Sequence, residues 1–181
     1  MNKVKKVLMT MFGLVMLPLL FACSNNQSAG IEAIKSKGKL VVALNPDFAP
    51  FEYQKVVDGK NQIVGSDIEL AEAIATELGV ELELSPMSFD NVLASVQSGK
   101  ADLAISGVSK TDERSKVFDF STPYYTSKNK LIVKKSDLAT YQSVNDLAQK
   151  KVGAQKGSIQ ETMAKDLLQN SSSYLCLKMG I

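Results

Sequence analysis

The 181-residue sequence contains no histidine and no tryptophan, and its two cysteines, Cys23 and Cys176, lie far apart. Histidine is the commonest general base and metal ligand, so its absence argues against most hydrolytic and metal-dependent mechanisms. Two distant cysteines cannot form a disulfide framework. The motifs CxxC, HExxH and GxSxG and a phosphate-binding loop are also missing. We therefore expect neither a metal site nor a cofactor.

Charge of one sign does not dominate either. The chain has 21 Lys and Arg against 19 Asp and Glu, a net charge of +2, with the signs mixed along its length. Nucleic-acid-binding domains carry a concentrated basic patch. We therefore expect no nucleic-acid partner.

The first 23 residues have the pattern of an export signal. Lysines near the N-terminus precede an apolar run, residues 7–21. The run is shorter than the roughly 20 residues of a membrane-spanning helix, and Ala22 supplies a small residue before a cut. Because the next residue is a cysteine, residues 20–23 (LFAC) resemble the lipobox of bacterial lipoproteins. We predict a signal peptide at 1–22 and a lipidated Cys23 that anchors the chain to the outer face of the membrane of a Gram-positive cell.

Beyond a polar tether, strand-like and helix-like segments alternate, which indicates an α/β fold with a largely parallel sheet. Ser66 and Ser158 are each followed three residues later by a glutamate, and both are predicted to be helix N-caps. Gly79 is predicted to end the first of these helices, and Asp58-Gly59 is predicted to form the turn that leads into the strand at 62–64. The predicted strands are 40–44, 51–57, 62–64, 81–84, 101–105, 117–120, 130–134 and 152–154. The predicted helices begin near residues 67, 89, 111, 143 and 158.

Several motifs, in this order, resemble the polar amino-acid-binding proteins of ABC importers (solute-binding protein family 3). They are NPDFAPFE (45–52), VGSDIELA (64–71), ADLAISGVS (101–109) with TDER (111–114), FDFSTPYY (118–125) and VGAQKGS (152–158). The resemblance implies a periplasmic-binding-protein-like fold of type II, in which two α/β lobes close on one ligand. The implied domains are a signal peptide (1–22), a lipidated cysteine and tether (23–37), lobe 1 (38–134), the start of lobe 2 (135–170) and a tail without family character (171–181).

The resemblance also implies roles for particular residues. Arg114, helped by groups around Ser109, would bind the α-carboxylate of a free amino acid. Ser106 and Gly107 would bind its ammonium group, together with an aspartate from a part of lobe 2 that this chain lacks. The remaining implied contacts are walls from Phe48 and Phe89, side-chain contacts from Asn45, Glu52 and Gln155, and backbone contacts from Ser158 and Gln160.

Each of these assignments has a plainer alternative. Arg114 could be a solvated residue paired with Asp112 or Glu113 on its own helix. Glu52 could be a surface residue of a strand, and Phe89 a core residue of its helix. In an enzyme without histidine, Glu52 and Asp67 would be the candidate acids or bases, but Asp67 is better explained by its place in the first turn of a helix, where acidic residues are favoured.

The resemblance implies a monomeric binding protein that is not an enzyme and that delivers a polar or basic amino acid to the membrane subunits of an ABC importer. Relatives bind arginine, lysine, histidine, glutamine or cystine, so the ligand stays open. Because the match stops near residue 170, we expect a truncated and impaired chain, in which lobe 1 folds in part and lobe 2 keeps one strand. The alternatives are an adhesive or sensory lipoprotein, a dehydratase-like enzyme on the same fold, or an inert fragment.

Overall fold

The computed structural model describes residues 30–148, 150–167 and 174–177. The predicted signal peptide and Cys23 lie outside these residues. The helices are α2 (Ile31–Lys37), α3 (Ser66–Leu78), α4 (Phe89–Gln97) and α5 (Ile159–Leu167), with 3₁₀ turns at Arg114–Lys116, Lys135–Asp137 and Val144–Leu147. The strands are β1 (Lys39–Leu44), β2 (Asp47–Phe48), β3 (Glu52–Val57), β4 (Lys60–Val64), β5 (Glu81–Pro86), β6 (Leu103–Ala104), β7 (Val152–Gln155) and β8 (Tyr174–Leu177).

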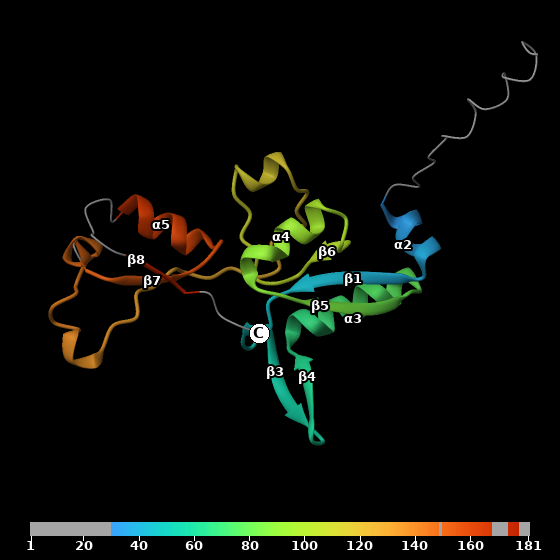
Figure 1. Ribbon diagram of the computed structural model, residues 1–181, viewed down its shortest axis with the longest axis horizontal. Coiled ribbons are helices and arrows are strands. Elements are labelled where there is room, and N and C mark those ends of the chain that lie inside the picture. Colours follow the sequence, from blue (N-terminus) through green and yellow to red (C-terminus); the bar gives the residue numbers. More distant parts are fainter. Residues whose placement is uncertain (1–29, 149, 168–173, 178–181) are drawn as a thin grey trace, which may run out of the picture. The chain divides into compact units, whose positions relative to one another are not determined.

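A parallel sheet in the order β5-β1-β6 forms the centre of the first half of the chain. Helix α3 covers one face and α4 the other (Figure 1). Leu40 and Val42 of β1 pack with Ala71 and Ala75 of α3, whereas Val41 of the same strand packs towards α4. Alternate residues of one strand thus enter two separate apolar clusters, as a strand buried on both faces requires. The predicted βαβ arrangement is confirmed.

Helix α3 begins differently from the prediction. Gly65, not Ser66, is its N-cap, with φ 131°, and Ser66 makes no capping bond. A Cβ at Gly65 would lie 2.2 Å from the carbonyl oxygen of Phe51, so this position requires glycine. The N–H groups of Ser66 and Asp67 donate to the carbonyls of Pro50 and Phe51, at 3.2 and 2.9 Å. Neighbouring backbone therefore satisfies the free donors of the first turn. The predicted stop at Gly79, in the left-handed conformation, is confirmed.

A second sheet, β2-β3-β4, is antiparallel. Asp58 and Gly59 form the two-residue turn between β3 and β4, and both have positive φ, 51° and 74°. This is the geometry of a type I′ hairpin turn, for which Asp-Gly is a preferred sequence. The predicted hairpin is confirmed, and it fixes where Glu52, at the start of β3, enters the interior.

The strands predicted at 117–120 and 130–134 are wrong. Neither segment pairs with a sheet in the described part of the chain. The side chain of Ile132 is 98% exposed. A strand needs a partner edge and a face to bury, and composition alone does not supply either.

The later residues form a smaller α/β group. Strands β7 and β8 pair in parallel, with Val152 opposite Tyr174, and Leu147 and Ala164 make a small buried cluster beside Val152. The expectation of a single strand here is wrong, because residues 174–177 add a second strand beside β7. Within the described residues, no helix is long and apolar enough to cross a membrane.

Candidate ligand-binding site

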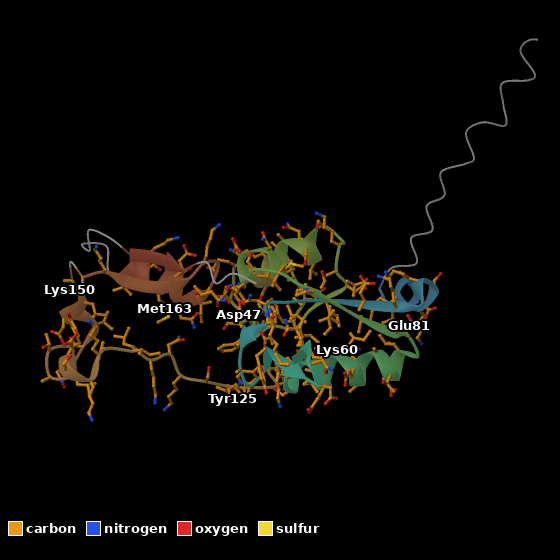
Figure 2. The ribbon with its side chains drawn as sticks, turned by 60° about the horizontal axis from the view of Figure 1, so that its bottom comes forward. Asp47, Lys60, Glu81, Tyr125, Lys150 and Met163 are labelled. Carbon is orange, nitrogen blue, oxygen red and sulfur yellow. The ribbon has the colours of Figure 1, made fainter. Side chains whose placement is uncertain are left out.

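Four of the predicted site residues lie where the parallel strands end. Asn45 follows β1, Phe89 begins α4 after β5, and Ser106 and Gly107 follow β6. Figure 2 shows Asp47 beyond this edge, and Glu81, the first residue of β5, at the other end of the sheet. Ligands of open α/β sheets bind at the carboxyl ends of the strands. The fold therefore brings these four residues to the edge of the sheet where a ligand would bind.

Asn45 connects several of these segments. It is only 1% exposed, and its N–H donates to the hydroxyl of Ser106 at 2.8 Å. Its amide Nδ2 donates to the carboxylate of Asp47 and the carbonyl of Met87, both at 3.0 Å. Its Oδ1 accepts a bond from Nε2 of Gln155 at 3.0 Å. Because all of its polar atoms are engaged, Asn45 is held rigidly, and it links Ser106 to Gln155, which lies 110 residues beyond Asn45 in the sequence.

Glu52 is buried completely, so the alternative of a surface strand residue is wrong. Its Oε1 accepts a bond from the hydroxyl of Ser106 at 2.8 Å, whereas Oε2 has no hydrogen-bond partner. Loss of hydration, together with the charge of nearby Asp67, raises the pKa of Glu52 from 4.5 to about 8, and the Ser106 bond offsets part of this rise. A buried carboxyl group with a free oxygen can receive a donor from a ligand.

Two residues beside Glu52 were not predicted as ligand-site residues. Asp67, only 1% exposed, accepts a bond from the hydroxyl of Tyr124 at 2.9 Å. Tyr124 is 54% exposed, and partial loss of hydration, followed by the charge of Asp67, raises the pKa of its phenol. The first-turn explanation for Asp67 is therefore incomplete. The only available signal was that Asp67 and Tyr124 each lie within a family motif, because burial cannot be seen in the residue itself.

The aromatic residues form a contiguous group beside Gly107. The rings of Phe48 and Phe51 are stacked with centroids 5.3 Å apart, and Tyr125 meets Phe51 edge-on at 4.8 Å. Phe48 remains 51% exposed, and its ring lies against Gly107, where an added Cβ would approach it to 3.0 Å. An exposed ring at the carboxyl edge offers an apolar wall. Phe89 is half-buried at the first position of α4, and its role as the opposite wall stays a prediction.

Arg114 is half-buried and bonded to backbone carbonyls. Its Nη1 donates to the carbonyl of Ser109 at 2.7 Å, and Nη2 to the carbonyl of Gly157 at 3.0 Å. The alternative, an arginine paired with Asp112 or Glu113, is therefore not what the structure shows. Burial lowers the pKa of this guanidinium from its ordinary value, which still leaves it charged at neutral pH. A carboxylate would be a stronger acceptor than either carbonyl.

The last two predicted residues stand at the start of α5. The hydroxyl of Ser158 accepts the N–H of Glu161 at 3.1 Å and donates to the carbonyl of Gln155 at 2.6 Å. The predicted capping role of Ser158 is confirmed. Gln160 is exposed, and its amide donates to Asn129 at 2.8 Å, so no recorded bond joins it to another predicted site residue. No cluster of three or more possible metal ligands occurs among the described residues.

The profile of the bacterial extracellular solute-binding proteins, family 3, matches residues 40–172. The chain belongs to this family. As a family 3 solute-binding protein it is 44% identical over 148 residues to the arginine-binding extracellular protein ArtP of Bacillus subtilis, a match that covers 82% of this chain and 54% of ArtP. The chain thus spans about half the length of the curated relatives that it matches.

Solved structures agree with this family 3 fold. An amino acid ABC transporter substrate-binding protein, AbpA from Streptococcus pneumoniae, bound to L-arginine, is 94% identical, with a TM-score of 0.79 over 82% of this chain and 62% of that one. The ancestral amino acid-binding protein AncCDT-1, described as a precursor of cyclohexadienyl dehydratase, is 36% identical, with a TM-score of 0.72 over 80% of this chain and 64% of that one. The predicted type II fold is confirmed over the aligned residues.

Proposed function

We propose that this chain binds a free cationic amino acid outside the cell, with L-arginine as the first candidate, for delivery to the membrane subunits of an ABC importer. The observation that carries the proposal is the pair of opposite chemistries at the carboxyl edge. Arg114 offers a charged guanidinium to an α-carboxylate, and Glu52 offers a buried oxygen without a partner to a cationic side chain. The arginine bound by the 94% identical AbpA supports the choice of ligand.

The other predicted residues complete the proposed site. Phe48 covers the aliphatic part of the ligand, where a cationic group gains about 0.5–2 kcal/mol from an aromatic face. Phe89 forms the opposite wall, and Ser106 and Gly107 bind the ammonium group. Asn45 and Gln155 approach the far end of the side chain, and Ser158 and Gln160 contribute from the second lobe.

Isothermal titration calorimetry of the purified chain tests the proposal. The expected result is binding of arginine with a preference over its uncharged isostere citrulline, and loss of that preference in Glu52→Gln. Arg114→Ala is expected to abolish binding of both ligands, because both carry the α-carboxylate. Equal affinity for arginine and citrulline in the unchanged chain would refute the role of Glu52.

We further propose attachment to the outer membrane surface by a lipid on Cys23, as the LFAC sequence indicates, in a Gram-positive cell. Two acyl chains give stable anchoring, which a single chain does not. Labelling of growing cells with an alkyne-bearing palmitate is expected to mark the chain, and Cys23→Ser is expected to be unlabelled and released into the medium. Labelling of the Cys23→Ser variant would refute the assignment.

Catalysis is the second candidate, because buried Glu52 has the raised pKa of a general acid. The solute-binding relatives are named for binding, and we propose that this chain is not an enzyme. If the chain turns over prephenate-like acids and Glu52→Gln abolishes this turnover, the proposal that it is not an enzyme is wrong.

A further inference from the structure

Two carboxyl groups are buried together beneath the proposed site. Glu52 enters from β3 and Asp67 from α3, and they are 0% and 1% exposed. Ser106, after β6, donates to Glu52, and the phenol of Tyr124 donates to Asp67. Asp47 lies further out, bonded to the amide of Asn45. In the described part of the chain, none of the groups recorded as hydrogen-bonded to either carboxyl is a cation.

Two neighbouring carboxylates without a cation cannot both be ionised in a buried place, so the pair retains a proton in the neutral range. The partners decide where the proton resides. The Tyr124 hydroxyl donates to Asp67 and so favours its ionised form. Oε2 of Glu52 receives no donor, and the hydrogen bond between the Glu52 and Asp67 side chains favours the protonated form of Glu52. The raised pKa of Glu52, about 8, agrees with this geometry.

We propose that the Glu52–Asp67 pair holds one proton in the ligand-free protein and releases it to solvent when the cationic end of the ligand donates to Glu52. The inference rests on the proposed function, because it needs a cationic ligand at this site. It assigns selectivity to residues that need not touch the ligand: Asp67 and Tyr124 act as positioning residues, which set the proton occupancy of Glu52. An uncharged side chain would leave the proton in place.

The exchange predicts a pH dependence of affinity with a definite sign. Below the pKa of Glu52 the ligand competes with a proton, so the association constant for arginine rises about tenfold per pH unit from pH 6 to 7 and levels off above pH 8. Citrulline has no charge to exchange, so its association constant stays flat. In Glu52→Gln both constants are flat.

Two measurements on the whole chain test the proposal. In the ligand-free protein, ¹³C NMR of the side-chain carboxyls should show one group that titrates near pH 8, absent from Glu52→Gln. Calorimetry at pH 7, in two buffers of different ionisation enthalpy, should show release of nearly one proton with arginine and none with citrulline. Asp67→Asn removes the like charge, so it should reduce the proton release. Glu69→Gln, an exposed position of the same helix, is the matched control and should change neither result.

The outcomes are distinguishable. Titration of Glu52 at its ordinary pKa overturns the proposal whatever the ligand does. A group that titrates near pH 8, combined with arginine binding that releases no proton, overturns the exchange while leaving the proposed function intact. Failure of arginine to bind contradicts the proposed function and the exchange with it.

Discussion

Because the carboxyl of Glu52 is buried, the free energy of unfolding should fall as the pH rises. In the unfolded chain its pKa is near the ordinary 4.5, and in the folded protein burial and Asp67 raise it to about 8. The folded state therefore retains a proton that the unfolded state has lost. This contribution is complete below pH 4.5 and is lost as the pH rises through about 8. One pKa unit corresponds to about 1.4 kcal/mol, so the free energy of unfolding should fall by up to about 2 kcal/mol between pH 6 and 8.

Urea unfolding followed by circular dichroism at pH 6 and pH 8 measures this difference. Glu52→Gln is the informative variant, because glutamine is close in shape to the protonated acid and can still accept the bond from Ser106. The expected result is a variant whose unfolding free energy changes with pH by about 2 kcal/mol less than that of the unchanged chain. Parallel pH dependences in the two proteins would refute the reasoning, since they would show that Glu52 titrates alike folded and unfolded.

Four further changes test other parts of the structure. Arg114→Lys keeps the charge but loses the planar fork, and should weaken arginine binding by about tenfold or more in calorimetry. Gly157→Ala should lower the unfolding free energy by about 1–2 kcal/mol in thermal melts, because φ is +79° and the new Cβ would lie 2.9 Å from Cα of Asp90. Leu40→Ala, at a side chain with 0% exposure, should cost about 3 kcal/mol in urea unfolding. Ser66→Ala should change the unfolding free energy by less than about 0.5 kcal/mol, because this serine makes no capping bond.

Two of these changes have a matched control variant. Lys116→Ala, exposed on the same 3₁₀ turn as Arg114, should leave arginine affinity unaltered. Gly99→Ala has a similar φ of +71° but open space around its Cβ, so it should be milder than Gly157→Ala. If the two glycine variants are equally destabilised, the contact with Asp90 does not matter. If Ser66→Ala lowers the free energy of unfolding by more than about 1 kcal/mol, the serine does act as a cap.

Much of the first half of the fold could be predicted because its signals are local. The apolar run that became β1, the Asp58-Gly59 turn and the stop at Gly79 each depend on the properties of a few neighbouring residues. The cap at Gly65 could not be found in this way. It depends on the carbonyls of Pro50 and Phe51, which reach the start of α3 only after the chain has folded.

The site shows the same limit. Family motifs predicted Glu52 and Arg114 as site residues, and the polar links of Asn45 to Ser106 and Gln155 bring three of the predicted residues together. The raised pKa of Glu52 could not be predicted, because it arises from burial and from Asp67, a residue of another motif. Tertiary contacts, not residue types, decide which carboxyl retains a proton.

The burial of β1 on both faces has a consequence for the register of this strand in the sheet. Its residues 40–44 are all apolar and nearly inaccessible, so a slip of one position would still present apolar side chains to both helices. The hydrophobic pattern of β1 therefore does not determine its register. Two hydrogen bonds at the ends of the run fix the register instead. The N–H of Val41 donates to the Asp102 carboxylate, and the N–H of Asn45 donates to the Ser106 hydroxyl. Ser106, which we propose as part of the ligand site, thereby also helps to set the alignment of β1, so a substitution of Ser106 is expected to affect both.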